Sequence, residues 1–405
     1  MLDSPTNAPA GEVDRSILDK VGDEAAFREA VRSWLADVMA RWTALNAEGP
    51  VSYYDNQKWW MTERNKVGLG TPHWPKEYGG SDLSLRYQVM IAEEVARARA
   101  PAMTMFVVSL NHVPHTLMHW GTEAQKTKYL PGVRNGVVWC QGFSEPGAGS
   151  DLASLRTRAV RDGDHYVVNG QKIWSSNSMY ADYCILLTRT DPEATKHRGI
   201  SYFLMDMKTP GVEVRPIRQA NGSSEFAELF LTDVRIPVEN LIGEENQGWS
   251  VAQSTLSAER GVLSFEAGER LRYMLEDFYT SAVARDAKWL KEPHLRRDFM
   301  RLFGEVQACR RLLRRLLREN EAGSPEASST VVHVKVINTT LRRHVSNFLL
   351  RTQGLEGQFH HLATEGMMQD PIHAYITSFG GTIAGGSNEI MRNIIAERVL
   401  GMPRA

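Results

Sequence analysis

Residues 143–151 read Phe-Ser-Glu-Pro-Gly-Ala-Gly-Ser-Asp and stand where the character of the chain changes. Two glycines and a proline in so short a run let backbone amides approach a planar or anionic ligand closely, with serine hydroxyls beside them. The same composition also suits a tight connection between a helix and a strand. Taken alone, the segment leaves both interpretations open, a ligand-binding loop and a structural turn.

A second segment follows at residues 169–177, Asn-Gly-Gln-Lys-Ile-Trp-Ser-Ser-Asn. Asn169-Gly170 lies between two β-rich pairs and predicts a hairpin with a type I′ turn. On the strand that leaves such a turn, side chains alternate, so we expect Trp174 and Ser176 to share one face. A single tryptophan most often belongs to a core. The two segments occurring together, in this order, favour a shared binding surface instead.

The rest of the chain divides into helical, β-rich and helical parts. Helical spacing of apolar residues begins near Asp23, with Phe27, Val31, Leu35 and Val38 on one stripe. Short β-rich runs dominate from Val138 to about Pro237, and helical patterns resume after Trp249. The low-complexity stretch 321–330 predicts a surface loop. We therefore predict a disordered tail at 1–22, a helical domain at 23–137, a β domain at 138–240 and a helical bundle domain at 241–405.

Composition narrows the classes of partner. With 47 Lys and Arg against 48 Asp and Glu, the chain has no long-range field to gather nucleic acid, and a small-molecule partner is favoured. Its three cysteines form no CxxC pair, which argues against a disulfide framework and a zinc site. The chain shows no long apolar run and no signal-peptide pattern. We expect a cytoplasmic protein without a membrane span or a bound metal.

One basic segment has two interpretations. Five arginines between Arg310 and Arg318 accompany the apolar stripe of Leu302, Val306, Cys309, Leu313 and Leu317. Such a helix could face nucleic acid or a membrane. The favoured interpretation is a buried stripe with a basic side that faces solvent or another subunit, because long basic side chains cover apolar surface readily.

The motifs SEPGAGSD and VVNGQKIWSSN together resemble the flavin-binding signature of the acyl-CoA dehydrogenases. The resemblance extends to WPKEYGG (74–80), GTEAQKTKYLP (121–131), DVRIPVENLIGEENQGW (233–249) and GGSNEIMRNIIAERVLG (385–401). It implies an α+β fold with an N-terminal helical domain, a middle β-barrel-like domain and a C-terminal four-helix bundle. It also implies FAD as cofactor, an acyl-CoA substrate, an electron acceptor such as an electron-transfer flavoprotein, and a homo- or hetero-tetramer.

Residue roles follow from the same resemblance. It implies that Phe143 and Ser144 lie against the isoalloxazine ring, that Trp174 packs on it and that Ser176 reaches flavin N5. Hydrogen bonds at these edges stabilise the ring as it gains negative charge. The implied cofactor set also includes Gln141, Gly149, Ser150, Ser387 and Glu389, with Gly149 and Ser150 at the junction of flavin and CoA pantetheine.

The position of the catalytic base departs from the commonest family pattern. Many members place a glutamate in a C-terminal loop, and the matching residue here is Gly385. Isovaleryl-CoA and long-chain members take the base from a helix, immediately before an arginine, which corresponds to Glu259 before Arg260. Glu259 also shares a helical stripe with Leu256 and Leu263, where burial would make it a stronger base. The alternative is a surface ion pair with an arginine such as Arg260.

The resemblance gives the remaining substrate contacts as Ser150, Arg260 and Gly385, whose amide would donate to the thioester carbonyl. The segments that hold the FAD tail match the family poorly, at 285–289 and 353–357. Three hypotheses follow: a catalytic dehydrogenase for a branched or bulky acyl group, a non-catalytic subunit of a mixed tetramer, or a flavin oxidase of the same fold. Similarity to bacterial dehydrogenases of steroid side-chain CoA esters makes such a substrate a candidate.

Overall fold

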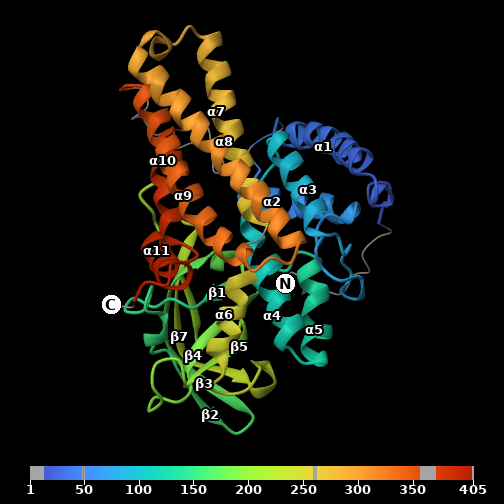
Figure 1. The fold of residues 1–405 in the computed structure, drawn as a ribbon. Helices are drawn as coiled ribbons and strands as arrows, with labels where there is room; N and C mark the ends of the chain where they lie inside the picture. The colour runs from blue at the N-terminus through green and yellow to red at the C-terminus, as the bar shows by residue number, and fades with distance from the viewer. Residues whose placement is uncertain (1–12, 48, 50, 259–261, 356–370, 404–405) are drawn as a thin grey trace. The chain divides into compact units, whose positions relative to one another are not determined.

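The computed structural model describes residues 13–47, 49, 51–258, 262–355 and 371–403 (Figure 1). The chain divides into two compact units, each assembled from separate segments. Unit 1 comprises Met1–Leu18, Val51–Asp82 and Ala102–Glu259, and unit 2 comprises Asp19–Pro50, Leu83–Pro101 and Arg260–Ala405. The predicted order of helical, β-rich and helical regions is confirmed by the order of the elements.

Helices of unit 1 flank its sheet and begin at clear sequence signals. Thr122 and Gln125 form a reciprocal capping box at the start of α5, which satisfies two amides that the first turn leaves unpaired. A π-helical turn at Val108–His112 leads directly into α4, where Pro114 stands in the first turn. The helices of this unit are α2 (Tyr53–Lys66), α4 (Val113–Trp120), α5 (Glu123–Arg134) and α6 (Gly248–Ala258).

In the described part of unit 1, eight strands form one mixed sheet in the order β6-β7-β3-β2-β4-β5-β8, with β1 paired to β4. The β1–β4 and β2–β4 pairs are parallel, whereas the other neighbours are antiparallel. The strands are β1 (Trp139–Gly142), β2 (Arg158–Asp162), β3 (His165–Ser176), β4 (Tyr183–Arg189), β5 (Ile200–Asp206), β6 (Val212–Ile217), β7 (Phe226–Pro237) and β8 (Leu241–Ile242).

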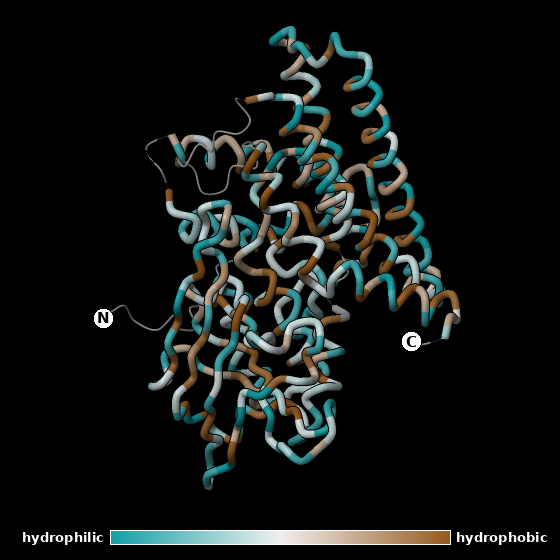
Figure 2. The backbone as a smooth tube through the Cα atoms, turned by 90° about the vertical axis from the view of Figure 1, so that its left-hand side faces the viewer, coloured by the Kyte–Doolittle hydropathy of each residue, from teal (hydrophilic) through white to brown (hydrophobic). Residues whose placement is uncertain are grey.

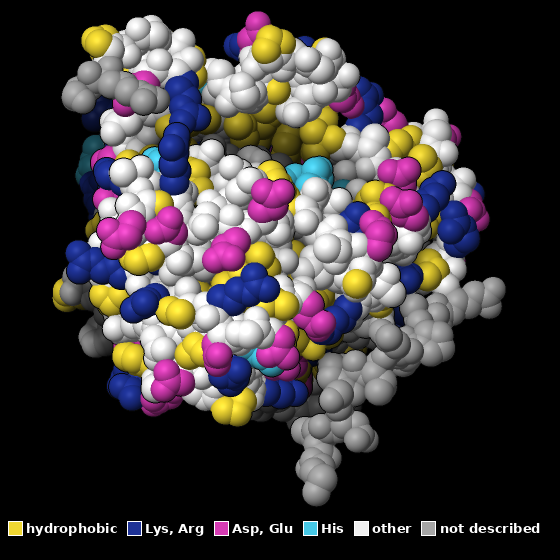
Figure 3. Space-filling view, turned by 90° about the horizontal axis from the view of Figure 1, so that it is seen from below, with side chains coloured by type: hydrophobic (Ala, Val, Ile, Leu, Met, Phe, Trp, Pro, Cys, Tyr) yellow, Lys and Arg dark blue, Asp and Glu magenta, His cyan; other side chains and the backbone are white. Residues whose placement is uncertain are grey.

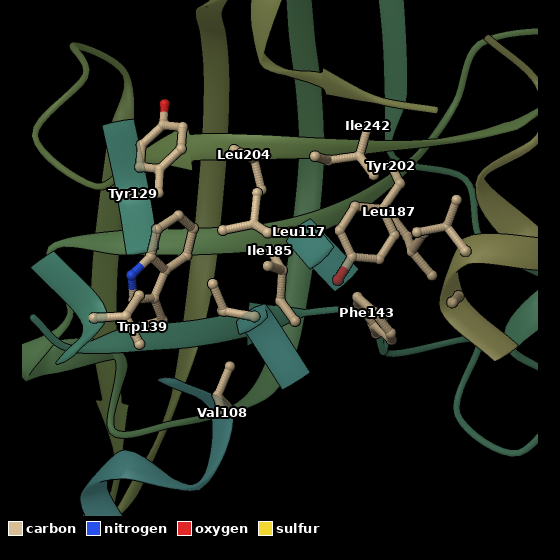
Figure 4. Close-up of a cluster of buried hydrophobic side chains, with 14 of the residues drawn as sticks. Val108, Leu117, Tyr129, Trp139, Phe143, Ile185, Leu187, Tyr202, Leu204 and Ile242 are labelled. Carbon is tan, nitrogen blue, oxygen red and sulfur yellow. The ribbon is translucent and has the colours of Figure 1, made fainter. Parts of the chain in front are cut away.

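Strands β4 and β5 are buried on both faces, which explains their continuous apolar sequences. Alternate residues such as Leu186 and Phe203 pack among strands, whereas Ile185 and Tyr202 pack against residues of α4, α5 and α6. Figure 4 shows the second of these clusters, in which Trp139 lies beside Tyr129. The hydropathy colouring in Figure 2 shows the same strands as brown runs.

The prediction of a hairpin turn at Asn169-Gly170 is wrong. Strand β3 runs straight through these residues, and the tight turn between β2 and β3 is Gly163-Asp164, with Gly163 at φ 60°. Gly170 instead marks a bulge against β7, where a Cβ atom would lie 2.5 Å from Thr157 Oγ1. Glycine is needed at this position because Thr157 approaches the strand closely, and not because the chain turns here.

Unit 2 is helical. Its helices are α1 (Glu24–Ala47), α3 (Leu85–Arg97), α7 (Val262–Ala284), α8 (Pro293–Glu321), α9 (Glu326–Thr352), α10 (Pro371–Ile383) and α11 (Asn388–Ile394), followed by a π-helical turn at Ile395–Val399. Helices α7, α8, α9 and α10 pack in sequence, and α3 packs on α7 (Figure 1). The stripe predicted in α1 is confirmed, because Phe27, Val31, Leu35 and Val38 are its buried residues.

The basic segment belongs to α8, and the buried-stripe interpretation is confirmed. Leu302, Val306, Cys309 and Leu313 are buried, although the next buried residue is Leu316 rather than Leu317. Three of the arginines form ion pairs within unit 2: Arg310 with Glu269, Arg314 with Glu93 and Arg315 with Glu319.

Two other expectations need adjustment. The surface loop predicted at 321–330 is shorter than expected and comprises only residues 322–325, because α9 already begins at Glu326. Gly323, at φ 62°, ends the preceding helix. The Ala and Ser residues that follow are compatible with a helix. Within the segment 1–22, residues 1–12 lie outside the described residues. Ile17 is buried, and the Asp14 amide donates a hydrogen bond to the Lys66 carbonyl. Residues 13–22 are therefore at least partly packed.

The surface carries interspersed charges. On the face shown in Figure 3, basic and acidic side chains alternate without a large patch of one sign, as the balanced composition predicts. None of the described helices combines the length and apolar character that a bilayer crossing requires.

Candidate functional site

The loop 143–151 is a tightly closed turn with an open outer edge. Glu145 and Ala148 exchange both backbone hydrogen bonds at 3.0 Å around Pro146-Gly147. Strand β3 is tied to it, because the Ile173 amide donates to the Ser144 carbonyl at 2.9 Å. A Cβ atom built at Gly147 or Gly149 meets no atom within 4 Å. These glycines leave room for a ligand rather than for a neighbouring element of the chain.

A buried ion pair fixes this loop to β3. Lys172 Nζ lies 2.8 Å from Glu145 Oε1, with side-chain exposures of 0% and 9%. The Glu145 carboxylate also accepts hydrogen bonds from the amides of Arg156 and Thr157, at 2.7 and 2.8 Å. Lys172 Nζ donates in addition to the Phe143 carbonyl at 3.2 Å. One lysine thus holds the first part of the loop at two points, the Phe143 carbonyl and the Glu145 carboxylate.

Burial and the charge of the partner act in opposite directions on the pKa of each member of this pair. Burial alone would raise the pKa of Glu145, but the Lys172 ammonium and the Thr157 hydrogen bonds hold that pKa below its ordinary value. Burial lowers the pKa of Lys172, and the attraction of Glu145 opposes that shift. Separating the partners would leave an uncompensated buried charge.

Trp174 lies in a bulge directly after this anchor. Lys172 faces Leu229 of β7 and Ser175 faces Ala227, so Ile173 and Trp174 together oppose one residue. Trp174 has φ 61°, a left-handed backbone that is a genuine outlier for a bulky residue. Its indole is 56% exposed and makes an edge contact with the Phe226 ring. A strained backbone that presents a large aromatic ring to solvent suits a stacking surface for a planar ligand.

The bulge also determines which neighbours of Trp174 are accessible. Ser175 is fully buried, while Ser176 is half-buried and lies on the other side of the strand. Trp174 and Ser176, which the sequence predicts to share one face, therefore both lie away from the side on which Ser175 is buried. Their contact with flavin remains a prediction.

Two other predicted cofactor residues are less available. The Phe143 ring is 3% exposed and packs edge-on against Tyr202, as Figure 4 shows, so a ligand could reach only its backbone. Gln141 is half-buried on β1, beside Ile185 of β4. Ser144 is half-buried, and Gly149 and Ser150 are exposed.

Unit 2 carries a second glycine loop, residues 384–387. Gly385 and Gly386 have φ values of 64° and 88°, in the region that favours glycine. Lys335 of α9 donates to the Gly386 carbonyl at 2.6 Å and to Asn388 Oδ1 at 2.9 Å. The same Asn388 oxygen accepts from Thr339 at 3.1 Å. Helix α9 therefore determines the course of this loop.

The structure gives Ser387 and Glu389 local partners. The Ser387 hydroxyl accepts a hydrogen bond from the Ile390 amide and caps α11. Glu389 is exposed and pairs with Arg392 at 3.3 Å. Contacts of these two residues with FAD remain a prediction.

Glu259 and Arg260 lie outside the described residues, but their neighbours are informative. Within unit 1, α6 is fixed to α4 by two side-chain hydrogen bonds, one between Thr116 and Thr255 at 2.6 Å and one between His115 and Ser254 at 2.9 Å. On α7, Glu266 pairs with Arg270 and Glu269 pairs with Arg310. Glu266 and Glu269 therefore both have ion-pair partners within unit 2.

At the corner between α7 and α8, the poorly matched segment 285–289 contributes to the core. Trp289 is buried and stacks on Phe278 with ring centroids 5.4 Å apart, close to Phe299 and Phe348. Arg285 is exposed and bonds only its own helix, at the Ser281 carbonyl. Of the segment 353–357, residues 353–355 are described, with Gly354 at φ 59°. Among the described residues 285–289 and 353–355, no set of buried polar groups would hold a phosphate.

Sequence reasoning missed the residues that hold the two loops. Strict alternation from Trp174 would place Lys172 on the exposed face, and only the bulge turns it inward. A signal was present nonetheless, because a lysine between β-branched and aromatic residues on a buried strand requires a carboxylate partner. Lys335 offers no comparable signal, since its partner is a backbone carbonyl.

Comparisons with known proteins agree with this architecture. Residues 22–137, 140–234 and 246–400 match the profiles described as acyl-CoA dehydrogenase N-terminal, middle and C-terminal domains. Together these define an FAD-dependent oxidoreductase. The chain belongs to the acyl-CoA dehydrogenase family, which confirms the predicted fold class and cofactor.

Relatives come from the same family. The acyl-CoA dehydrogenase IpdE1 of Mycobacterium tuberculosis is 36% identical, over 94% of this chain and 98% of that protein. Among solved structures, the Tcur3481-Tcur3483 steroid ACAD is 33% identical with a TM-score of 0.81, covering 94% of this chain and 98% of that one. The ChsE4-ChsE5 complex from Mycobacterium tuberculosis is 32% identical with a TM-score of 0.78, covering 93% and 97%.

Proposed function

We propose that the chain catalyses the FAD-dependent α,β-dehydrogenation of a bulky acyl-CoA thioester. The observation that carries the proposal is the exposed indole of Trp174, held in a left-handed backbone directly beside the anchored loop 143–151. Strain of this kind persists where the surrounding structure enforces it, and it concentrates at ligand sites.

The residues of unit 1 fit a flavin. Trp174 offers a flat apolar face, Ser144 and Ser176 offer half-buried hydroxyls, and Gly147 and Gly149 leave open space beside them. When bound, FAD supplies the acceptor for the substrate β-hydride. Ser176 and the loop amides would donate hydrogen bonds to the edge of the ring that gains negative charge. Gly149 and Ser150 would contact the CoA pantetheine.

Glu259 is the proposed base for the α-proton. The C-terminal loop offers Gly385 without a carboxylate, and the residue before Arg260 is the other place where the family supplies one. Taking the α-proton as the β-hydride leaves forms the α,β double bond. The amide of Gly385 would stabilise negative charge on the thioester oxygen as it develops. Arg260 would contact the substrate.

The relatives support a bulky substrate. One solved relative is described as a steroid ACAD, and isovaleryl-CoA dehydrogenase of Pongo abelii is 29% identical over 77% of this chain and 75% of that protein. We therefore propose a branched or polycyclic acyl group. Two of the solved relatives carry paired names, Tcur3481-Tcur3483 and ChsE4-ChsE5, which supports a mixed oligomer as an alternative to a homotetramer.

Anaerobic flavin bleaching tests the proposal. The purified chain should be yellow, and a panel of linear, branched and steroid side-chain acyl-CoA esters should bleach it, fastest with the bulky members. A colourless chain that acquires flavin only with a second subunit would support the non-catalytic role. Stoichiometric peroxide in air would support a flavin oxidase. A yellow chain that no acyl-CoA bleaches would contradict the proposal.

A further inference from the structure

We infer that the buried Lys172–Glu145 ion pair is a positioning device that holds the FAD-facing loop 143–148 in register with Trp174. The inference rests on the proposed function. It adds two residues that would act on the cofactor through the loop, without touching FAD themselves.

The contacts of Lys172 support this role. A fully buried lysine is rare unless it is paired, and this one donates to the Glu145 carboxylate at 2.8 Å and to the Phe143 carbonyl at 3.2 Å. Both acceptors belong to the loop, and Lys172 itself lies two residues before Trp174. One side chain thus joins the loop to the strand that presents the indole.

Glu145 extends the connection to a third segment. Its second oxygen accepts from the Arg156 amide and its first from the Thr157 amide, so the loop is also tied to the chain entering β2. Gly142 packs closely beside the lysine stem: a Cβ atom there would lie 2.8 Å from Leu186 Cδ1, closer than packing allows, and 3.5 Å from Lys172 Cγ, an ordinary contact. The pair is therefore enclosed on several sides by packed residues.

The energetics separate positioning from stability. Replacing both members of a buried ion pair by uncharged residues of similar shape is often neutral for folding, because the desolvation cost of both charges disappears. If the Lys172–Glu145 pair served only stability, both residues could therefore be replaced together without loss. If the pair sets the geometry of the loop, their joint replacement should disturb that geometry, because the Phe143 carbonyl and the side chain at position 145 lose their directed donor.

The experiment compares apoprotein unfolding with FAD affinity in the full-length chain. The double variant Lys172→Met/Glu145→Gln keeps the approximate shape of both side chains and retains an acceptor oxygen for one of the two amides of Arg156 and Thr157. We expect its apoprotein to melt close to the wild-type temperature. We expect its Kd for FAD to rise by about tenfold or more, a loss of about 1.4 kcal/mol, with a shifted flavin absorption band.

The control is Arg310→Met/Glu269→Gln, which removes a partly buried pair of unit 2, with side-chain exposures of 17% and 9% and N and O atoms 2.6 Å apart. Its FAD affinity should stay at the wild-type value. If the Lys172 double variant does not fold, Glu145→Gln alone serves, since it keeps size and hydrogen bonding and should still raise the Kd severalfold.

The outcomes are separable. A folded Lys172 variant with wild-type FAD affinity and an unchanged flavin spectrum would overturn the inference and leave the proposed function standing. A wild-type chain that takes up no FAD would contradict the proposed function itself, and the inference with it.

Discussion

Two glycine loops carry the candidate chemistry, and they are held in different ways. The loop 143–151 in unit 1 is anchored by a fully buried lysine and a buried carboxylate. Together these two groups make four polar contacts, one with each other and three with backbone groups. The loop 384–387 in unit 2 is anchored by Lys335 at the protein surface and by the Ser387 cap of α11.

The difference suggests that the two loops have different functional roles. A buried and fully satisfied charge pair is costly to rearrange, so the first loop should hold one geometry. A hydrogen bond in contact with water is weaker and yields more easily. We expect the first loop to determine how a cofactor is bound and the second to influence how a substrate is bound.

The largest expected effect concerns the carboxylate that the second loop lacks. If Gly385 contributes only an amide, the base must come from elsewhere, and Glu259→Gln should slow flavin reduction by about 10² to 10⁴-fold, the usual worth of a general base. FAD content should not change. Anaerobic stopped-flow absorbance with a confirmed substrate measures this rate.

Glu266→Gln is the control for that variant, because Glu266 pairs with Arg270 and has a structural role. Wild-type reduction by Glu259→Gln would contradict the assignment. Adding Gly385→Glu tests whether the loop can supply the missing carboxylate. Recovery should be incomplete, since a glutamate at φ 64° carries a strain of about 1 to 2 kcal/mol.

A second test addresses the division between the loops directly. Lys335→Met removes the donor to the Gly386 carbonyl and should lower kcat/KM by about 10 to 100-fold, the worth of a hydrogen bond to a charged group. The Kd for FAD should change less than about twofold. Equal losses in FAD affinity and in kcat/KM would show that the loops are not separable. Lys128→Met, at an exposed pair with Glu239, provides the control.

A third test separates strain from contact at Trp174. Removing the indole in Trp174→Ala or Trp174→Gly should weaken FAD binding by about tenfold in both variants. The glycine variant should be the more stable apoprotein by about 1 kcal/mol, because only glycine adopts a positive φ without cost. Chemical denaturation and FAD titration measure the two effects. Unchanged FAD affinity in both variants would contradict the stacking role.

The smallest expected effect is a dependence on acid. Because the folded pKa of Glu145 lies below its ordinary value of 4.5, ionised Glu145 stabilises the loop fully above about pH 4.5. That contribution is lost as the pH falls through the lowered pKa. The Kd for FAD should be flat between about pH 7 and 5 and should rise a few-fold below pH 4.5 in the wild type. The rise should be smaller in Glu145→Gln, as measured by flavin fluorescence.

The sequence predicts much of the fold because its signals there are local. Helical spacing identified the stripe of α1, and short β-rich runs identified the region of the strands. Family motifs identified the two loops. The shared face of Trp174 and Ser176 also followed from alternation within one strand.

Features that depend on partners distant in sequence were not predictable in the same way. Asn169-Gly170 has the composition of a turn, and only Thr157, packed against it, shows why glycine is needed inside a strand. The bulge at Trp174 depends on the register with β7, which a single strand does not reveal. Lys172 and Lys335 likewise depend on groups 27 and 51 residues away.

The interleaved composition of the two units has a consequence for synthesis. Helix α3 leaves the ribosome early, yet it packs on the later helix α7. In addition, Arg86 of α3 pairs with Glu321 across 235 residues, and Arg99, just after α3, pairs with Asp277 across 178. At about 5 to 20 residues per second, α3 waits about 10 to 50 seconds with an apolar face uncovered. The nascent chain should therefore be a good chaperone client, and truncation at the borders of the family domains should not give a fragment that folds alone.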